Sequence, residues 1–260
     1  MAPPPSSGAA PRAGAAAMRS AVGGVLDEVR ETLIPSRRSA TGALPLLLVG
    51  MTALTGLVDA FSYLTLGHVF VANMTGNVVF LGFALAGVSG FSIGTSLLAI
   101  GAFMVGAFAA AVLRFRVQHR LDRQFGLAGA IQVVLLAGAL VINLRAGTSP
   151  TGTARDLLIA ILAVAMGVQN ATARGSGVAD LTTTVLTMTI TGIVADVRGI
   201  GGGGARPGRR LISVAAMLIG AIVGAALILR GQGSLPLALA LILAAVIAAC
   251  SPLVPRTKPA

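Results

Sequence analysis

Long stretches without a charged side chain are the feature that most constrains the fold of this chain. Residues 80–113 contain no Asp, Glu, Lys or Arg, and residues 128–144 contain none either. A run of about 18 or more apolar residues is long enough to cross the hydrocarbon layer of a membrane as a helix. Charged residues make up only 10% of the chain, whereas a soluble domain usually carries about a quarter. The sequence therefore predicts an all-α, multi-pass integral membrane protein.

The basic residues are gathered in short clusters between the apolar segments. The formal net charge is +11, and the clusters are Arg37 and Arg38, then Arg114, Arg116, Arg120 and Arg123, then Arg198, Arg206, Arg209 and Arg210. Membrane proteins keep such residues on the cytoplasmic side of the bilayer. A nucleic-acid-binding surface would require a basic face interleaved with aromatic side chains, and this sequence has no such face. We therefore expect the lipid bilayer as a partner and no nucleic acid.

The sequence contains no set of residues that is typical of an enzyme active site. Cys250 is the single cysteine and stands in an apolar run, so neither a disulfide framework nor a cysteine metal site is available. His68 and His119 have no carboxylate partner at metal-ligand spacing. The glycine-rich stretch 199–208 lacks the Lys-Ser/Thr pair of a phosphate-binding loop. We therefore expect no catalytic residues, no metal, no cofactor and no enzymatic activity.

The chain divides into a tail, one membrane domain and a short polar end. Residues 1–42 are rich in Pro, Ala, Gly and Ser. They form either a disordered tail or, near residues 22–34, a short amphipathic helix at the membrane surface. Residues 43–254 form a single membrane domain, and residues 255–260 are polar. The domain contains eight apolar segments, near residues 44–66, 70–88, 92–113, 125–144, 155–173, 180–197, 210–230 and 234–253.

The two halves of the membrane domain, residues 44–144 and 155–253, show a weak internal repeat. GLVDAFSY resembles GVQNATAR, and MTGNVVFLG can be aligned with LTMTITGIV. The alignment pairs Gly56 with Gly167 and Asp59 with Asn170 at an offset of 111 residues, and Thr75 with Thr187 at an offset of 112. Each half then has one long helix, a short segment rich in Thr, Asn and Gly, and two more long helices.

Two topologies are compatible with this layout. If the two short segments are re-entrant, thirteen basic residues share one side and only Arg145, Arg155 and Arg230 lie on the other. If all eight segments cross, the basic residues divide ten against six. The charge bias favours six full spans with two re-entrant segments. In that topology the halves have three spans each and are inverted repeats, as in many transporters and channels. The length of segment 70–88 argues instead for eight spans.

The polar motifs resemble those of the YoaK-like family of bacterial inner-membrane proteins. The resemblance is carried by GLVDAFSYLTLGHVFVANMTGNVVFLG in the first half and AMGVQNATARGSGVADLTTTVLTMTITG in the second. It covers roughly residues 44–253, with Met188 standing where the family often has glycine. It implies a multi-pass bacterial membrane protein without an established activity, for which small-molecule transport is the usual suggestion. The family supplies no binding residues to carry over.

Several polar residues stand at positions where a membrane segment is otherwise apolar. An acid inside the bilayer is costly and normally faces the bundle interior or a wet cavity, so Asp59 is a candidate for a proton- or cation-coupling carboxylate. Asn73 can cap a helix that begins near Thr75 and Asn77. The alternative for these residues is internal capping with no ligand. The full candidate solute or ion pathway is Asp59, Asn73, Thr75, Asn77, Gln169, Asn170 and Thr187.

The sequence favours a secondary transporter or channel that carries an unidentified small polar or charged molecule. A non-transporting membrane scaffold or partner subunit is the alternative. The GxxxG at Gly220 and Gly224 and the small residues Ala102, Gly106 and Ala110 are predicted packing faces. Such faces are also compatible with a homo-oligomer. The expected location is the bacterial inner membrane, with both termini in the cytoplasm.

Overall fold

The computed structural model describes residues 23–34, 42–118, 120–147, 149–177 and 207–256, and every regular element among them is a helix. The predicted segment 180–197, with Thr187, lies outside these residues. A helix over residues 23–33 precedes the bundle. The bundle elements are α2 (Leu44–Thr65), α3 (Met74–Leu85), α4 (Ile93–Arg116), α5 (Leu121–Ala146), α6 (Gly152–Gly175), α8 (Pro207–Leu229), α9 (Leu235–Ala249) and the 3-10 turn η1 (Ser251–Leu253).

Five of these helices are long and apolar enough to cross a membrane. They are α2, α4, α5, α6 and residues 208–229 of α8, with 22 to 26 residues each. At about 1.5 Å per residue such a helix spans the roughly 30 Å of a bilayer core. The 15-residue α9 is shorter and continues into η1. The all-helical membrane bundle that the sequence predicted is therefore confirmed.

The helix α3 is too short to cross a membrane. It has 12 residues, or about 18 Å of helix. The chain also returns to where it started, because the rings of His68 before α3 and Phe91 after it lie 6.1 Å apart. This first short segment thus starts and ends at the same end of the bundle, which is the path of a re-entrant segment in the six-span topology.

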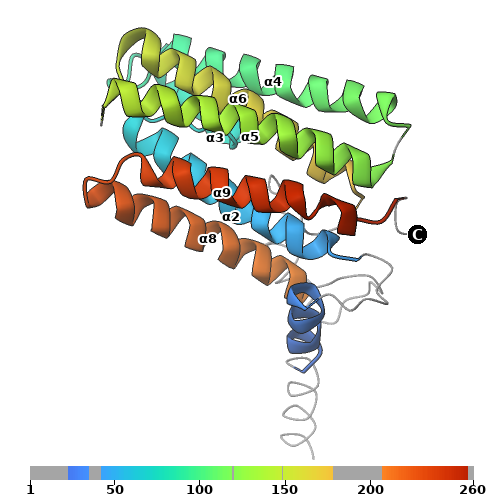
Figure 1. The fold of residues 1–260 in the computed structure, drawn as a ribbon. Helices are drawn as coiled ribbons and strands as arrows, with labels where there is room; N and C mark the ends of the chain where they lie inside the picture. Colours follow the sequence, from blue (N-terminus) through green and yellow to red (C-terminus); the bar gives the residue numbers. More distant parts are fainter. Residues whose placement is uncertain (1–22, 35–41, 119, 148, 178–206, 257–260) are drawn as a thin grey trace, which may run out of the picture.

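The long helices alternate in direction between two ends of the bundle (Figure 1). At one end Leu121 at the start of α5 donates a backbone hydrogen bond to Arg256 O at 3.2 Å. At the other end Asn143 near the end of α5 donates to Ser234 Oγ at the start of α9 at 3.0 Å. The helices α2 and α6 run in opposite directions, as do α4 and α8, and α5 and α9.

Two helix pairs are packed backbone to backbone at glycines. A Cβ added at Gly56 of α2 would collide with the carbonyl of Met217 in α8, and one at Gly220 would collide with the carbonyl of Ala53. The second pair, α4 with α6, repeats this arrangement. There, Gly167 faces the carbonyl of Phe103, and Gly106 faces the carbonyl of Val164. Small residues of this kind allow membrane helices to approach closely.

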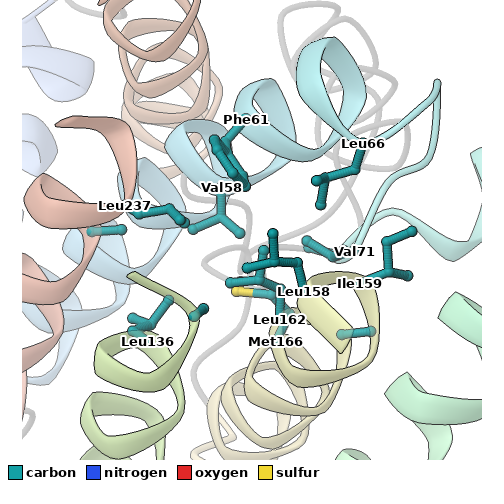
Figure 2. Packing of buried hydrophobic residues seen from close by; sticks show 14 of the residues in the cluster. Val58, Phe61, Leu66, Val71, Leu136, Leu158, Ile159, Leu162, Met166 and Leu237 are labelled. Atoms are coloured by element: carbon teal, nitrogen blue, oxygen red, sulfur yellow. The ribbon is translucent and has the colours of Figure 1, made fainter. Parts of the chain in front are cut away.

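The helices α2 and α6 are mostly buried, whereas few residues of α4 and α8 are buried. The main apolar core lies between α2, α5, α6 and α9. It includes Val58 and Phe61 on α2, Leu136 on α5, Leu162 and Met166 on α6, and Leu237 on α9 (Figure 2). Leu66 and Val71, from the loop between α2 and α3, belong to the same cluster. The core therefore places this loop directly against α6.

Candidate functional site

The carboxylate of Asp59 binds the loop that precedes α3. Asp59 lies on α2 and is only 4% exposed. Its Oδ1 accepts hydrogen bonds from the backbone N–H groups of Val71, at 3.1 Å, and Ala72, at 2.9 Å. Its Oδ2 is buried and has no hydrogen-bond partner among the described residues. Asp59 thus satisfies two loop donors that would otherwise be unpaired in an apolar environment, and it keeps one oxygen available.

Asn77 binds the same loop at Phe70. It lies in the first turn of α3 and is fully buried. Its Oδ1 accepts from Phe70 N at 3.0 Å, and its Nδ2 donates to Phe70 O at 2.6 Å. Asn73 is the N-cap of α3, as predicted, with its side chain accepting from Gly76 N at 3.4 Å. Thr75 is exposed at the start of the helix.

Gln169 connects three helices at the centre of the bundle. It lies on α6 and is buried. Its Nε2 donates to Thr55 Oγ1 at 2.9 Å and to Met51 O at 3.1 Å, both on α2. Its Oε1 accepts from Gln132 Nε2 of α5 at 2.6 Å. Its neighbour Asn170 donates to Met166 O, one turn earlier in the same helix, at 2.9 Å.

The structure therefore brings the predicted residues together in two groups. Asp59 and Asn77 meet on the loop residues Phe70 to Ala72, whereas Gln169 reaches Thr55, one helical turn from Asp59 on α2. Thr187 lies outside the described residues.

Sequence reasoning missed the polar residues of α5. Gln124, Gln132 and Asn143 are buried, together with Ala128, Leu136 and Ala139. The members of this set of six residues follow one another at spacings of three or four, and any two consecutive spacings add up to seven or eight. Such spacings place all six on one face of a helix. The signal was present in the sequence, because this face carries all three amides of an otherwise apolar segment.

Buried oxygen atoms without partners occur at two depths of the bundle. Besides Asp59 Oδ2, they are Gln124 Oε1 and Thr172 Oγ1 among the described residues. The Gln124 side chain lies against α6 at Gly175, where an added Cβ would come within 3.2 Å of its Nε2. Thr172 is one helical turn earlier on α6. Polar groups therefore run along the buried faces of α2, α5 and α6 from the α3 loop, past Gln169, to the far end.

Six rings surround the re-entrant segment, and they define the aromatic end of the bundle. They are Tyr63, His68, Phe70, Phe80, Phe83 and Phe91, with centroid separations of 5.0 to 6.3 Å between neighbours. Tyr63 stacks on Phe70, next to the residues that Asp59 binds. The rings thus pack the start of α3 and its loop against the end of α2.

The opposite end, which we call the arginine end, carries most of the basic side chains. Among the described residues they are Arg30, Arg114, Arg116, Arg120, Arg123, Arg174, Arg209, Arg210 and Arg256, against Arg145, Arg155 and Arg230 at the aromatic end. Arg120 forms an ion pair with Asp122 at 2.6 Å. Its hydrogen bond to Asp122 raises the pKa of the Arg120 guanidinium, which is charged at physiological pH in any case.

Comparison with known proteins supports the resemblance found in the motifs. Residues 47–250 match the family described as "Protein of unknown function (DUF1275)". The chain is also similar to the UPF0700 transmembrane protein YoaK of Bacillus subtilis (strain 168), with 32% identity over 154 residues. That alignment covers 58% of this chain and 67% of the relative. No solved structure gives a significant match. The chain is therefore a multi-pass helical membrane protein that belongs to the DUF1275 family.

Proposed function

We propose that this protein is a secondary transporter or channel that moves a small polar or positively charged solute across the bacterial inner membrane. The observation that carries the proposal is the series of buried polar side chains from Asp59, through Thr55, Gln169 and Gln132, to Gln124 and Thr172. A bundle that only needed to pack could have apolar side chains at these positions.

The unpartnered oxygens indicate the chemistry of the solute. A buried polar atom without a hydrogen bond costs about 1–3 kcal/mol, and such atoms in native proteins need an explanation, such as water or an ion. Asp59 Oδ2, Gln124 Oε1 and Thr172 Oγ1 are all oxygens that accept hydrogen bonds or coordinate cations. Water, a proton donor or a monovalent cation would complete them. This is why a cationic or hydrogen-bond-donating solute is favoured over an anion.

The packing of the glycines supports an inverted repeat. Gly56 corresponds to Gly167 and Ala53 to Val164, both at an offset of 111 residues. Their partners Met217 and Gly220 correspond to Phe103 and Gly106 at an offset of 114. The first long helix of each half thus packs on the third helix of the other half, and matched helices run in opposite directions. Inverted repeats of this kind support alternating access to a site near mid-membrane.

The arginine end is assigned to the cytoplasm. Nine described arginines lie there and three at the aromatic end, and Lys and Arg accumulate on the cytoplasmic side of membrane proteins. Asp59 and the re-entrant α3 then lie toward the outer face.

A scaffold or partner subunit is the second candidate, and one observation favours it. Both polar groups of the Asn77 amide are satisfied by Phe70, and all the hydrogen bonds of Gln169 are internal. In that function the polar residues only hold the re-entrant loop and the central helices together.

A flux measurement separates the two functions. The purified protein is reconstituted in vesicles that contain a pH-sensitive dye, and Na⁺, K⁺, ammonium and small amines are added outside in turn. Transport predicts a proton or cation flux that protein-free vesicles lack and that Asp59→Asn reduces at least tenfold. No flux with any of these, together with no difference in metabolite uptake between cells with and without the protein, would favour the scaffold.

A further inference from the structure

Residues 23–33 form a short helix outside the bundle, with Ile34 directly after it, and the helix is docked on the first turn of α8. Glu28 Oε2 accepts a hydrogen bond from Gly208 N at 2.9 Å. A Cβ added at Gly208 would lie 2.8 Å from both Val25 O and Glu28 Cβ, so the contact depends on a glycine. A carboxylate at a helix N-terminus is favoured by the backbone dipoles. The docking geometry is therefore specific rather than incidental.

The docked helix has three different faces. A helix turns about 100° per residue, so Val25, Glu28 and Thr32 share the face turned to α8, and Thr32 is fully buried. The next face carries Leu26 and Leu33, which are 61% and 44% exposed, and Ile34, directly after the helix, is 67% exposed. Arg30 lies between them, and the acidic residues Asp27 and Glu31 are exposed on the remaining face.

The position of the helix determines what this apolar face meets. Gly208 is the second residue of α8, at the arginine end, and Leu211, Leu218 and Ile219 further along α8 are 51%, 57% and 59% exposed. These side chains belong to a membrane span, so the lipid phase begins within one turn of the docking contact. Figure 1 shows the helix, in blue, running crosswise to α8 and outward from the bundle. A helix in this place lies along the membrane surface rather than across it.

We infer that residues 23–34, a helix over 23–33 followed by Ile34, lie at the membrane interface and insert Leu26, Leu33 and Ile34 into the lipid leaflet at the arginine end. Its composition fits this place, because an amphipathic helix lies in the headgroup region with its apolar side chains in the acyl boundary. Arg30 can extend its guanidinium to the headgroups while its methylene stem stays with the leucines. The arginines of the same end attract anionic lipids to this leaflet. The partner of this face is therefore a phospholipid surface that contains anionic lipid.

The chain offers a clean test because it contains no tryptophan. Single variants Leu33→Trp, Ile34→Trp, Asp27→Trp and Leu218→Trp are reconstituted in phosphatidylcholine–phosphatidylglycerol vesicles. Tryptophan fluorescence is measured with lipids that carry a spin label either near the headgroup or deep in the acyl chain, and with aqueous iodide. We expect Trp at 33 and 34 to be quenched at least twofold more by the shallow label than by the deep one.

The other two variants are the matched controls. Trp at 218, on the lipid face of a span, should be quenched by the deep label, and Trp at 27 should be quenched by iodide alone. Iodide quenching of Trp at both 33 and 34, equal to that at 27, would overturn the inference because the face would be in water. Protection of both from lipid labels and iodide would also overturn it, since a protein surface such as a second copy would then cover the face. Positions 33 and 34 are both tested because one variant can fail to fold, which gel filtration detects. The fluorescence of the other variant then still decides the outcome.

Discussion

Asn77 forms two hydrogen bonds to the backbone of one residue, Phe70, seven positions earlier in the chain. Its amide pairs with the N–H and the carbonyl of Phe70 as a neighbouring strand would. The backbone N–H and carbonyl of Phe70 thus both have hydrogen-bond partners without water. A lipid environment requires this, because it contains no water to bind exposed backbone groups. Asn77 therefore fixes the start of α3 together with the Asn73 cap.

The first prediction concerns this pair. Asn77→Asp keeps an acceptor for Phe70 N but loses the donor to Phe70 O, and Asn77→Ala loses both. We expect each to lower the stability of the folded protein by about 1–3 kcal/mol, because buried backbone groups lose their partners. Thermal unfolding in detergent measures the effect. Thr75→Ala, at an exposed site in the same turn, is the control and should behave as wild type. An unchanged melting temperature for Asn77→Ala would show that α3 is held by other contacts.

The second prediction concerns the helix crossings. Gly56→Ala and Gly167→Ala place a methyl group against the carbonyls of Met217 and Phe103, and forcing helices apart typically costs about 1–3 kcal/mol. Both should lower the melting temperature by similar amounts. Gly138→Ala in α5 meets nothing within 4 Å, so it should be neutral or slightly stabilising. Different effects at 56 and 167 would count against equivalent crossings in the two halves.

The third prediction concerns orientation. In a Cys250→Ala background, Gln118→Cys reports on the arginine end and Gln232→Cys on the aromatic end, and both positions are exposed. An impermeant thiol reagent should label Gln232→Cys in intact cells and Gln118→Cys only after permeabilisation. The reverse pattern would place the arginine end outside and reject the cytoplasmic assignment.

The fourth prediction concerns Asp59. Asp59→Asn keeps an oxygen that can accept from Val71 N and Ala72 N, so the loop and the fold should be retained. It removes the ionisable group, and proton- or cation-coupled flux into vesicles should fall at least tenfold. Asp156→Asn removes an acid that is half exposed and paired with Arg155 at 3.2 Å, and its flux should equal that of wild type. Full flux in Asp59→Asn would leave Asp59 with a purely structural role.

Helix content and the start of α3 could be predicted from the sequence because their causes are local. The length of a segment without charged residues predicts a membrane span. An asparagine before Met74 supplies the helix cap that the structure shows. The residue at which α9 ends was harder to predict from the sequence. Its predicted segment continued to residue 253, but Pro252 follows Ser251 and the chain changes to a 3-10 turn, because proline disfavours helical backbone in the residue before it.

The partners of the buried polar residues could not be predicted in the same way. Gln132 stands in an apolar run, and periodicity indicates which face it occupies but not which helix lies opposite. Its bond to Gln169 joins positions 37 residues apart, and that of Gln169 to Thr55 joins positions 114 apart. Such contacts depend on how the helices are arranged, which no local pattern encodes. Asp59 illustrates the same limit, because its loop partners follow it by 12 and 13 residues.

The pairing of α2 with α8 also has a consequence for the order of synthesis. Gly56 leaves the ribosome early, whereas Met217 and Gly220, which it contacts, are made near the end of the chain. During most of translation α2 must therefore remain in the membrane without its closest neighbour, with the carboxylate of Asp59 already inserted. A chain that stopped before residue 207 would lack α8 altogether, and the glycine face of α2 would have no helix packed on it at Gly56. Completion of the last two helices is thus the step that makes the first one stable.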